Sequence, residues 1–377
     1  MNATDPARIV LVGAGGMGGA WLRVLSAHPQ VQVVGVVDLD LDRARDLARS
    51  AGTGAPVART IPEFDGGADA IVNATVPQAH LEVSVAALER GMAVLCEKPA
   101  APTIAEAIRM AAAAQVHGRL LMVSQSRRYG PGVAAFAEAI RAHQGGSPGL
   151  LVSEFFRAPR FGGFRERMRH VLLVDMAIHA FDTARLLTGA DPVAVYCDES
   201  NQDWSWFDHD ASASAIFEFP GSARYLYTGS WIAEGAETSW NARWRSVGAG
   251  STIRWDGEAQ VTVHTGAGEG TDEGEAVPVP PAAEGIEGAL EVFLSALASG
   301  QTPLGEVREN IASLAMVEAA VRSARTRQRV EIADVLTDGL AVALRTEDDE
   351  ARAAVLAAWS TDDGAPVFGT RTIAGQR

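Results

Sequence analysis

The chain has 377 residues, of which 47% are apolar and 21% charged, and its formal net charge at neutral pH is −15. A single hydrophobic core seldom grows to this length, so we expect two domains. The negative charge argues against a nucleic-acid partner, because proteins that bind a phosphate backbone usually display a basic patch.

Cysteine content and apolar patterning narrow the class of protein further. Two cysteines are too few for a disulfide framework or a cysteine-rich zinc site. No apolar stretch reaches the roughly 18 residues that suggest a membrane span. The N-terminal apolar run leads directly into glycines, which is typical of a strand and not of a signal peptide. We therefore expect a cytoplasmic protein with no membrane partner.

The first third of the chain alternates short β-branched runs with longer segments rich in alanine and leucine. The runs are apolar on both faces and predict buried strands at 8–12, 31–37, 70–75, 93–97 and 120–125. The segments between them have helical spacing, and glycine stands at or just past several of their ends. This βαβ alternation predicts a doubly wound parallel sheet, and we assign residues 1–125 to it.

After about residue 130 the apolar pattern changes to a period of two. Segments such as "SASAIFEFP" and "ARYLYTGSWIA" predict antiparallel strands, so residues 126–335 are expected to form an α+β domain. Residues 336–377 are left as a C-terminal extension of unknown role, with one helix expected in it.

Aromatic residues gather in this second region. Six of the eight tryptophans fall between Trp204 and Trp255, and Tyr225, Tyr227 and Trp231 share one face of a predicted strand. One interpretation is packing against a helix layer or an oligomer partner. The other is that one or two of the tryptophans stack on a substrate ring.

A glycine-rich turn follows the first predicted strand. Gly13, Gly15 and Gly18 have G-x-G-x-x-G spacing at the start of a predicted helix, which is the context that a dinucleotide site requires. Amides at a helix N-terminus can then face phosphates. Asp38 ends the second strand, 20 residues after Gly18, where a carboxylate would hold the ribose hydroxyls and repel a 2′-phosphate. We therefore expect NAD rather than NADP, with the alternative that Asp38 is a helix N-cap.

Two further stretches combine polar chemistry with an apolar context. Lys98 follows the fifth strand, at the edge where open α/β sheets bind ligands, and Pro99 keeps it out of a helix. The segment "VLLVDMAIHAFD" resembles a core helix, yet Asp175, His179 and Asp182 can lie along one stripe of it. We interpret Asp182 as a hydrogen-bonded structural carboxylate. No metal is expected, because no second histidine or cysteine cluster has ligand spacing.

Together these motifs resemble a known family. "GAGGMG", "TVPQAH", "EKP" and "DMAIHAFD" occur in the order and at separations that are similar to those of the glucose–fructose oxidoreductase, inositol dehydrogenase and MocA (Gfo/Idh/MocA) family. The resemblance covers roughly residues 8–330, although Ala177 stands where the family often has glycine. It implies an N-terminal Rossmann domain and a C-terminal α+β domain whose large, open, mostly antiparallel sheet often joins subunits. A homodimer or homotetramer is therefore expected.

The resemblance also implies roles for individual residues. Lys98 would bind the reacting hydroxyl and the nicotinamide ribose, His179 would be the general acid/base, and Asp175 would orient the substrate or the imidazole. Arg128 and Arg160 would reach the substrate. The residues expected around the dinucleotide are Gly13, Gly15, Gly16, Met17, Gly18, Asp38, Thr75, Pro77, His80, Glu97 and Lys98.

The chemistry of alcohol oxidation agrees with these roles. The hydroxyl proton must be removed as hydride leaves the same carbon, and a histidine with an ordinary pKa near ~6.5 can take and return a proton at neutral pH. A lysine ammonium stabilises the developing alkoxide. Lys98 and His179 are therefore expected to converge on one oxygen.

The leading hypothesis is an NAD-dependent dehydrogenase that acts on a sugar, inositol or related polyol, and the arginines of "APRFGGFRERMRH" leave room for an acidic or phosphorylated sugar. One alternative is a glycoside-cleaving enzyme that oxidises its substrate transiently and eliminates the leaving group. The other is a non-catalytic NAD-binding regulator, against which the joint presence of Lys98, Asp175 and His179 argues.

Overall fold

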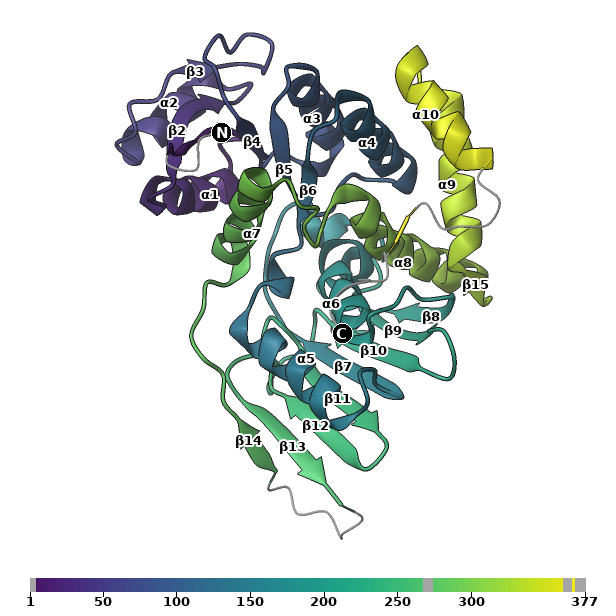
Figure 1. The fold of residues 1–377 in the computed structure, drawn as a ribbon. Coiled ribbons are helices and arrows are strands. Elements are labelled where there is room, and N and C mark those ends of the chain that lie inside the picture. The colour runs from purple at the N-terminus through teal and green to yellow at the C-terminus, as the bar shows by residue number, and fades with distance from the viewer. Residues whose placement is uncertain (1–4, 267–273, 362–367, 370–377) are drawn as a thin grey trace. The chain divides into compact units, whose positions relative to one another are not determined.

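The computed structural model describes residues 5–266, 274–361 and 368–369 (Figure 1). Contacts divide the chain into two compact units. The first unit runs to Ser126 and also contains Ile286–Ile311 and Asp338–Gly369, and the second contains Arg127–Gly285 and Ala312–Thr337. No helix in the described part of the chain is both long and apolar enough to cross a membrane.

The first unit is built on a six-stranded, wholly parallel sheet in the order β3-β2-β1-β4-β5-β6. Its strands are β1 (Ala7–Val12), β2 (Val31–Val37), β3 (Val57–Ala58), β4 (Ala70–Asn73), β5 (Ala93–Glu97) and β6 (Leu121–Ser124). The crossover helices are α1 (Gly16–Ala27), α2 (Leu41–Ser50), α3 (His80–Glu89) and α4 (Ile104–His117), and short 3₁₀ turns lie at η1 (Pro77–Ala79) and η2 (Ser126–Arg128). This is the predicted doubly wound sheet, and the five predicted strands are all present.

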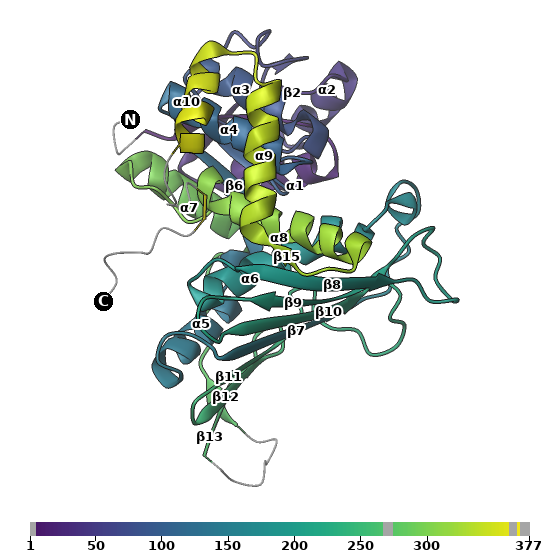
Figure 2. The ribbon, with the colours of Figure 1, turned by 90° about the vertical axis from the view of Figure 1, so that its right-hand side faces the viewer.

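The stretch after residue 335 holds two helices where one was expected. They are α9 (Ile332–Thr346) and α10 (Glu350–Thr361), and α10 packs against α4 (Figures 1 and 2). Between them, Glu347 accepts hydrogen bonds from Arg109 Nε on α4 at 2.9 Å and from Arg352 Nε on α10 at 2.9 Å. Burial opposes ionisation of Glu347, but these hydrogen bonds hold its pKa below the ordinary value. The extension is therefore fastened to the first unit by a shared carboxylate.

The second unit is built on a nine-stranded sheet in the order β14-β13-β12-β11-β7-β10-β9-β8-β15, which is antiparallel except where β10 runs parallel to β7. Its strands are β7 (Leu150–Phe156), β8 (Ala194–Ser200), β9 (Ser212–Glu218), β10 (Arg224–Ser230), β11 (Arg243–Gly248), β12 (Ser251–Trp255), β13 (Val261–Thr265), β14 (Glu275–Val277) and β15 (Val330–Glu331). Its helices are α5 (Pro131–His143), the 3₁₀ turn η3 (Arg165–Arg167), the π-helix η4 (Leu172–Ala177) and α6 (Ile178–Thr188). Helix α7 (Gly285–Ser299) belongs to the first unit from Ile286 onward, and α8 (Val307–Thr326) passes from the first unit to the second after Ile311. The predicted large, mostly antiparallel sheet is confirmed.

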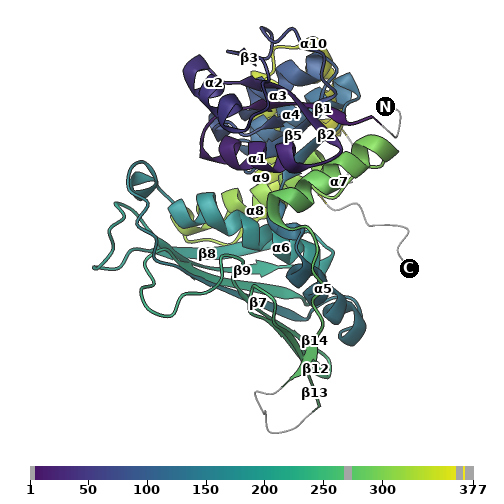
Figure 3. The same ribbon diagram turned by 90° about the vertical axis from the view of Figure 1, so that its left-hand side faces the viewer.

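Helices cover one face of this sheet (Figures 2 and 3). Phe181 on α6 packs edge-on against Phe217 of β9, with ring centroids 4.7 Å apart. Phe136 on α5 contacts Trp255 of β12 at 5.9 Å. The predicted alternation is also found in β10 and just beyond its end, where Tyr225, Tyr227 and Trp231 are all buried. For Trp255, packing against a helix layer is therefore confirmed.

Candidate active site

The glycine-rich turn connects β1 to α1, and its shape requires two of its glycines. Gly13 has a φ of +97°, and a Cβ there would lie 2.7 Å from the carbonyl oxygen of Ala74. A Cβ at Gly18 would lie 1.9 Å from the carbonyl oxygen of Gly13. The N-cap of α1 is Gly15, so no side chain satisfies the first amides of the helix. Backbone donors at an uncapped helix start, approached closely by the turn, suit a pyrophosphate.

Asp38 lies beside this turn at the end of β2. Its Oδ2 accepts from the Ala14 amide at 2.7 Å, and its Oδ1 accepts from the Asp40 amide at 2.8 Å. The N-cap of α2 is Asp40, whose side chain accepts from the amides of Asp42 and Arg43. The alternative that Asp38 caps the helix is therefore wrong, because the helix begins two residues later than that interpretation required.

His80 joins two loops at the carboxyl edge of the sheet. Its Nδ1 lies 2.9 Å from the Pro99 carbonyl oxygen and its Nε2 lies 3.2 Å from the Thr75 carbonyl oxygen. The side chain is fully buried, and burial lowers its pKa below the ordinary value. With both nitrogens facing backbone carbonyls, His80 braces the loop of Thr75 and Pro77 against the loop after Lys98.

Glu97 makes a second brace in the same unit. Its Oε1 accepts from Trp21 Nε1 on α1 at 2.8 Å, and its Oε2 accepts from the Lys98 amide at 3.1 Å. Burial raises the pKa of this carboxyl above its ordinary value. Lys98 itself is half-buried at the end of β5. The motif "EKP" is thereby tied to the helix that follows the glycine-rich turn, while Met17 on that helix is 45% exposed.

In the second unit, the segment "VLLVDMAIHAFD" is not one continuous α-helix. Leu172–Ala177 is π-helical and only Ile178–Thr188 is α-helical. A π-turn widens the spacing of side chains and is frequent at functional sites. The single α-helical stripe expected for Asp175, His179 and Asp182 therefore does not hold.

Asp182 is structural, as predicted. Its carboxylate accepts from Arg128 Nε at 2.5 Å and Arg128 Nη2 at 2.6 Å, and from Ser313 Oγ at 2.5 Å. Both charged side chains are about 2% exposed. A bidentate guanidinium with a third donor satisfies the buried carboxylate.

This pair changes the interpretation of Arg128. Its guanidinium is held by Asp182, and Arg128 does not line the pocket described below. Arg160 is also engaged elsewhere, since it pairs with Glu234 at 3.0 Å and lies 3.6 Å above the Trp206 ring centroid. The expectation that these two arginines reach the substrate receives no support from their positions.

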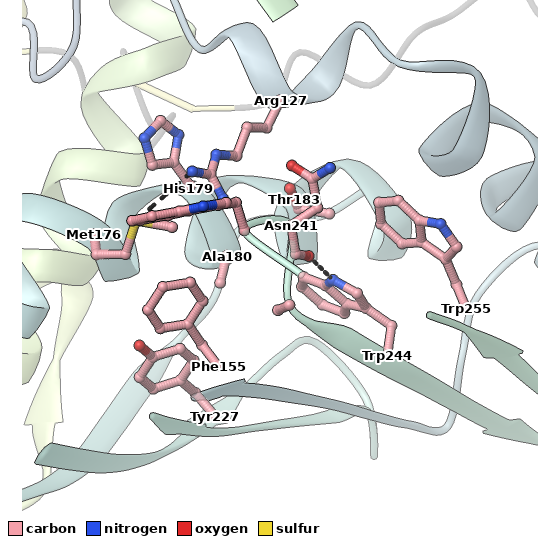
Figure 4. A pocket seen from close by; sticks show the side chains of 12 residues that line it. Arg127, Phe155, Met176, His179, Ala180, Thr183, Tyr227, Asn241, Trp244 and Trp255 are labelled. Atoms are coloured by element: carbon pink, nitrogen blue, oxygen red, sulfur yellow. Dashed lines mark hydrogen bonds between the residues drawn. The ribbon is translucent and has the colours of Figure 1, made fainter. Parts of the chain in front are cut away.

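His179 lines a pocket within the second unit (Figure 4). It is 8% exposed. Most of its neighbours there are apolar or aromatic, and the polar ones are few. The lining consists of Arg127, Phe155, Met176, His179, Ala180, Thr183, Tyr227, Trp240, Asn241, Ala242, Trp244 and Trp255.

Asp175 stands on the π-turn just before His179. Its Oδ2 accepts from Arg165 Nε at 3.0 Å. Arg165 comes from η3, and its guanidinium also lies 5.3 Å from the Phe161 ring centroid. The loop between β7 and the π-turn is thus tied to a carboxylate that we expected at the substrate.

Sequence reasoning missed Arg127 and Trp240. "QSRRYG" offers two adjacent arginines, and only the demand of Asp182 for a buried cation could have separated them. Trp240 is 40% exposed in the pocket, whereas Trp244 and Trp255 are buried and pair across β11 and β12. Within the described residues, no three histidine, cysteine or acidic side chains are placed to hold a metal ion.

Comparisons with known proteins agree with this architecture. Residues 7–125 match the model of the oxidoreductase family with an NAD-binding Rossmann fold, and residues 133–264 match that of the GFO/IDH/MocA C-terminal domain. An inositol 2-dehydrogenase of Renibacterium salmoninarum is 34% identical over 193 residues, which are 50% of this chain and 56% of that one. The match therefore spans only about half of that dehydrogenase.

Two further relatives are similar over nearly their full length. An inositol 2-dehydrogenase of Rhizobium meliloti is 26% identical over 353 residues, 86% of this chain and 99% of that one. The solved structure of an oxidoreductase from Agrobacterium radiobacter, in complex with NAD+, L-tartaric acid and magnesium, has a TM-score of 0.76 at 19% identity, covering 87% of this chain and 99% of that one. With family models matching both parts of the chain, the protein belongs to the Gfo/Idh/MocA family of NAD-binding oxidoreductases.

Proposed function

We propose that the protein is an NAD-dependent dehydrogenase that exchanges hydride between nicotinamide and a secondary hydroxyl of a sugar, inositol or related polyol. The observation that carries this proposal is a histidine at the wall of an aromatic pocket, next to a π-turn that presents a carboxylate. The names of the two inositol 2-dehydrogenase relatives support the substrate class.

The chain's own side chains supply proton transfer and charge stabilisation. NAD, when bound, accepts the hydride at C4 of its nicotinamide. His179 takes the hydroxyl proton, Lys98 stabilises the developing negative charge, and Asp175 orients the substrate or the imidazole. In the apolar surroundings of the pocket, the imidazole of His179 interacts more strongly with a charge than it would in water.

The acidic end of β2 supports NAD over NADP. Two acidic residues, Asp38 and Asp40, stand at this edge, and Arg43 lies 3.3 Å from Asp40 and 4.0 Å from Asp38. Arg43 is thereby shared between two carboxylates, and a 2′-phosphate would add a further negative charge beside them. We expect the affinity for NAD to exceed that for NADP.

The sheet face opposite the helices supports the proposed homodimer or homotetramer. Paired positions place Val152, Leu226, Ile216 and Tyr196 in one row across β7, β10, β9 and β8. Ile216 and Tyr196 are 48% and 47% exposed. An apolar row on an uncovered sheet face suits an interface between copies of the chain.

The test is to incubate the protein with NAD and a panel of sugars and polyols while following absorbance at 340 nm. We expect turnover with at least one of them, and a 10²–10⁴-fold lower kcat for His179→Asn, with NAD affinity retained. His143→Asn, at an exposed position on α5, is the matched control. Full turnover by His179→Asn would contradict the proposed role.

Product analysis separates this proposal from its alternatives. A dehydrogenase accumulates a ketone with stoichiometric NADH. A glycoside-cleaving enzyme releases free sugar without net NADH, and a regulator binds NAD without turnover of any carbohydrate.

A further inference from the structure

Unlike the neighbouring arginines, Arg127 has no carboxylate of the described residues in ion-pair contact. Arg157, Arg160 and Arg165 pair with Glu237, Glu234 and Asp175, and the adjacent Arg128 pairs with Asp182. Among the described residues, the polar contact of the Arg127 side chain is the Met176 sulfur, at 3.8 Å from Nη2. No carboxylate of the described residues is therefore in ion-pair contact with the Arg127 guanidinium, and Glu258 attracts this charge only from a longer distance.

Keeping the Arg127 guanidinium charged in this pocket costs desolvation free energy. Burial lowers the pKa of Arg127 to about 10, which still leaves it charged at neutral pH. A half-buried ion without a close counter-ion is unfavourable, and a thioether sulfur is only a weak acceptor. An anion that enters with the ligand would offset this cost, so the charge favours anionic ligands over neutral ones.

The surroundings of Arg127 limit what that anion can be. Met176 and Phe155 line the same pocket (Figure 4), as does Trp240, and these side chains provide apolar contact for a carbon skeleton rather than further donors for a multiply charged group. A planar guanidinium matches a carboxylate in shape, and the two charges are equal and opposite. A phosphate dianion would keep an excess negative charge here.

We propose that the pocket takes a polyhydroxy acid, a sugar acid whose carboxylate pairs with Arg127 while a secondary hydroxyl faces His179. The inference rests on the proposed dehydrogenase function and narrows its substrate class from neutral polyols to hydroxylated carboxylates. The aromatic wall then contacts the C–H face of the substrate.

The experiment compares each neutral sugar with its matching acid, for example hexose with hexuronate and alditol with aldonate, and includes the hexose 6-phosphate. We expect kcat/KM to be at least ~10-fold higher for the acid than for its neutral counterpart. Arg127→Gln should lower kcat/KM for the acid about 100-fold and for the neutral sugar only a few-fold. Arg127→Lys should recover part of the loss, because the charge remains.

The matched control is Arg141→Gln on the surface of α5, where the arginine pairs with Glu138 and both side chains are more than half exposed. We expect it to leave both substrates unaffected. A preference for the neutral sugar or the phosphate, or an equal loss for acid and neutral sugar in Arg127→Gln, would overturn the proposal and leave the dehydrogenase function standing.

Binding provides a readout that does not depend on turnover. Hexuronate titrated into protein saturated with NADH should bind, and Arg127→Gln should weaken that binding about 100-fold. Arg127-dependent binding without oxidation of any substrate would support the anion site and contradict the proposed function. Absence of binding by every acid would overturn the anion site itself.

Discussion

The two candidate regions of this protein are built in different ways. At the nucleotide edge of the first unit, backbone geometry dominates: two glycines allow close approach, and His80 and Glu97 hold loops through backbone groups. In the pocket of the second unit, side chains dominate, with aromatic rings around a histidine and an arginine. A turn that depends on backbone geometry requires particular residues, such as glycines, at fixed spacing in the sequence. Side-chain pockets assemble from distant segments and leave no such spacing.

The largest predicted effect concerns the neighbours Arg127 and Arg128. Arg128→Met leaves the buried Asp182 carboxylate with the Ser313 hydroxyl and with Arg185, whose Nη1 lies 3.9 Å away, and should lower the free energy of unfolding by about 3–5 kcal/mol. Urea denaturation measures this loss. The double variant Arg128→Met, Asp182→Leu should recover part of it, since the carboxylate that lost its partner is also removed and Arg185 keeps its ion pair with Asp191.

Arg141→Met is the control for the loss of an arginine as such, because its ion pair is exposed and should contribute less than about 1 kcal/mol. If the free energy of unfolding of Arg128→Met lay within about 1 kcal/mol of that of the unaltered protein, the assignment of Arg128 to structure would be wrong. Arg128 would then no longer differ from Arg127 as a structural residue.

The second prediction tests the backbone argument at the nucleotide edge. Gly18→Ala places a Cβ 1.9 Å from the Gly13 carbonyl oxygen, so the turn must move. Overpacking of this kind costs about 1–3 kcal/mol, and we expect NAD affinity to fall about 100-fold, as measured by calorimetric titration. In Gly19→Ala, on the same helix, the added Cβ meets only a Leu47 methyl at 3.9 Å, so affinity should stay unchanged. Equal losses in both variants would rule out the close approach as the cause.

The first unit shows which elements the sequence could predict and which it could not. Strand β5 was predicted at Ala93–Glu97 and found there, because buried parallel strands are continuous apolar runs. Strand β3, Val57–Ala58, was missed because two residues carry no periodic signal. The glycine spacing gave the turn that follows β1, since the steric demand at Gly18 is local.

The pocket could be predicted only in part. His179 was identified by motif, but the choice between Arg127 and Arg128 depends on Asp182, 54 residues away from Arg128. The prediction that Asp175, His179 and Asp182 share one helical stripe assumed an α-helical period. The π-turn at Leu172–Ala177 changes that period. A tertiary partner decided the first point, and an assumed α-helical period hid the second.

The third prediction concerns the pH dependence of stability that His80 causes at the nucleotide edge. Burial lowers the pKa of His80, so the unfolded chain, with an ordinary histidine pKa near ~6.5, binds this proton more readily than the folded protein. Stability is therefore lost as pH falls below about 6.5, by at most about 1.4 kcal/mol per pH unit from this residue.

Urea unfolding at pH 7.0 and pH 5.5 should show a smaller loss on acidification in His80→Gln than in the unaltered protein. His117→Gln, at a position that is half-buried at the end of α4, is the control and should keep the original pH dependence. An unchanged slope in His80→Gln would mean that the brace between the two loops does not depend on a neutral imidazole.

The smallest predicted effect separates binding from packing among the tryptophans. Trp240 is 40% exposed in the pocket, and Arg157 lies 4.6 Å above its ring. If its face contacts the substrate, Trp240→Leu should raise KM about 3–10-fold with kcat nearly unchanged, which corresponds to the ~0.5–1.5 kcal/mol of an aromatic contact. Trp204→Leu removes a tryptophan that is 67% exposed and outside the pocket lining, and should leave KM unaltered. A lower kcat with unchanged KM in Trp240→Leu would instead assign this ring to the positioning of the reacting groups, since such a change reports an interaction made only in the transition state.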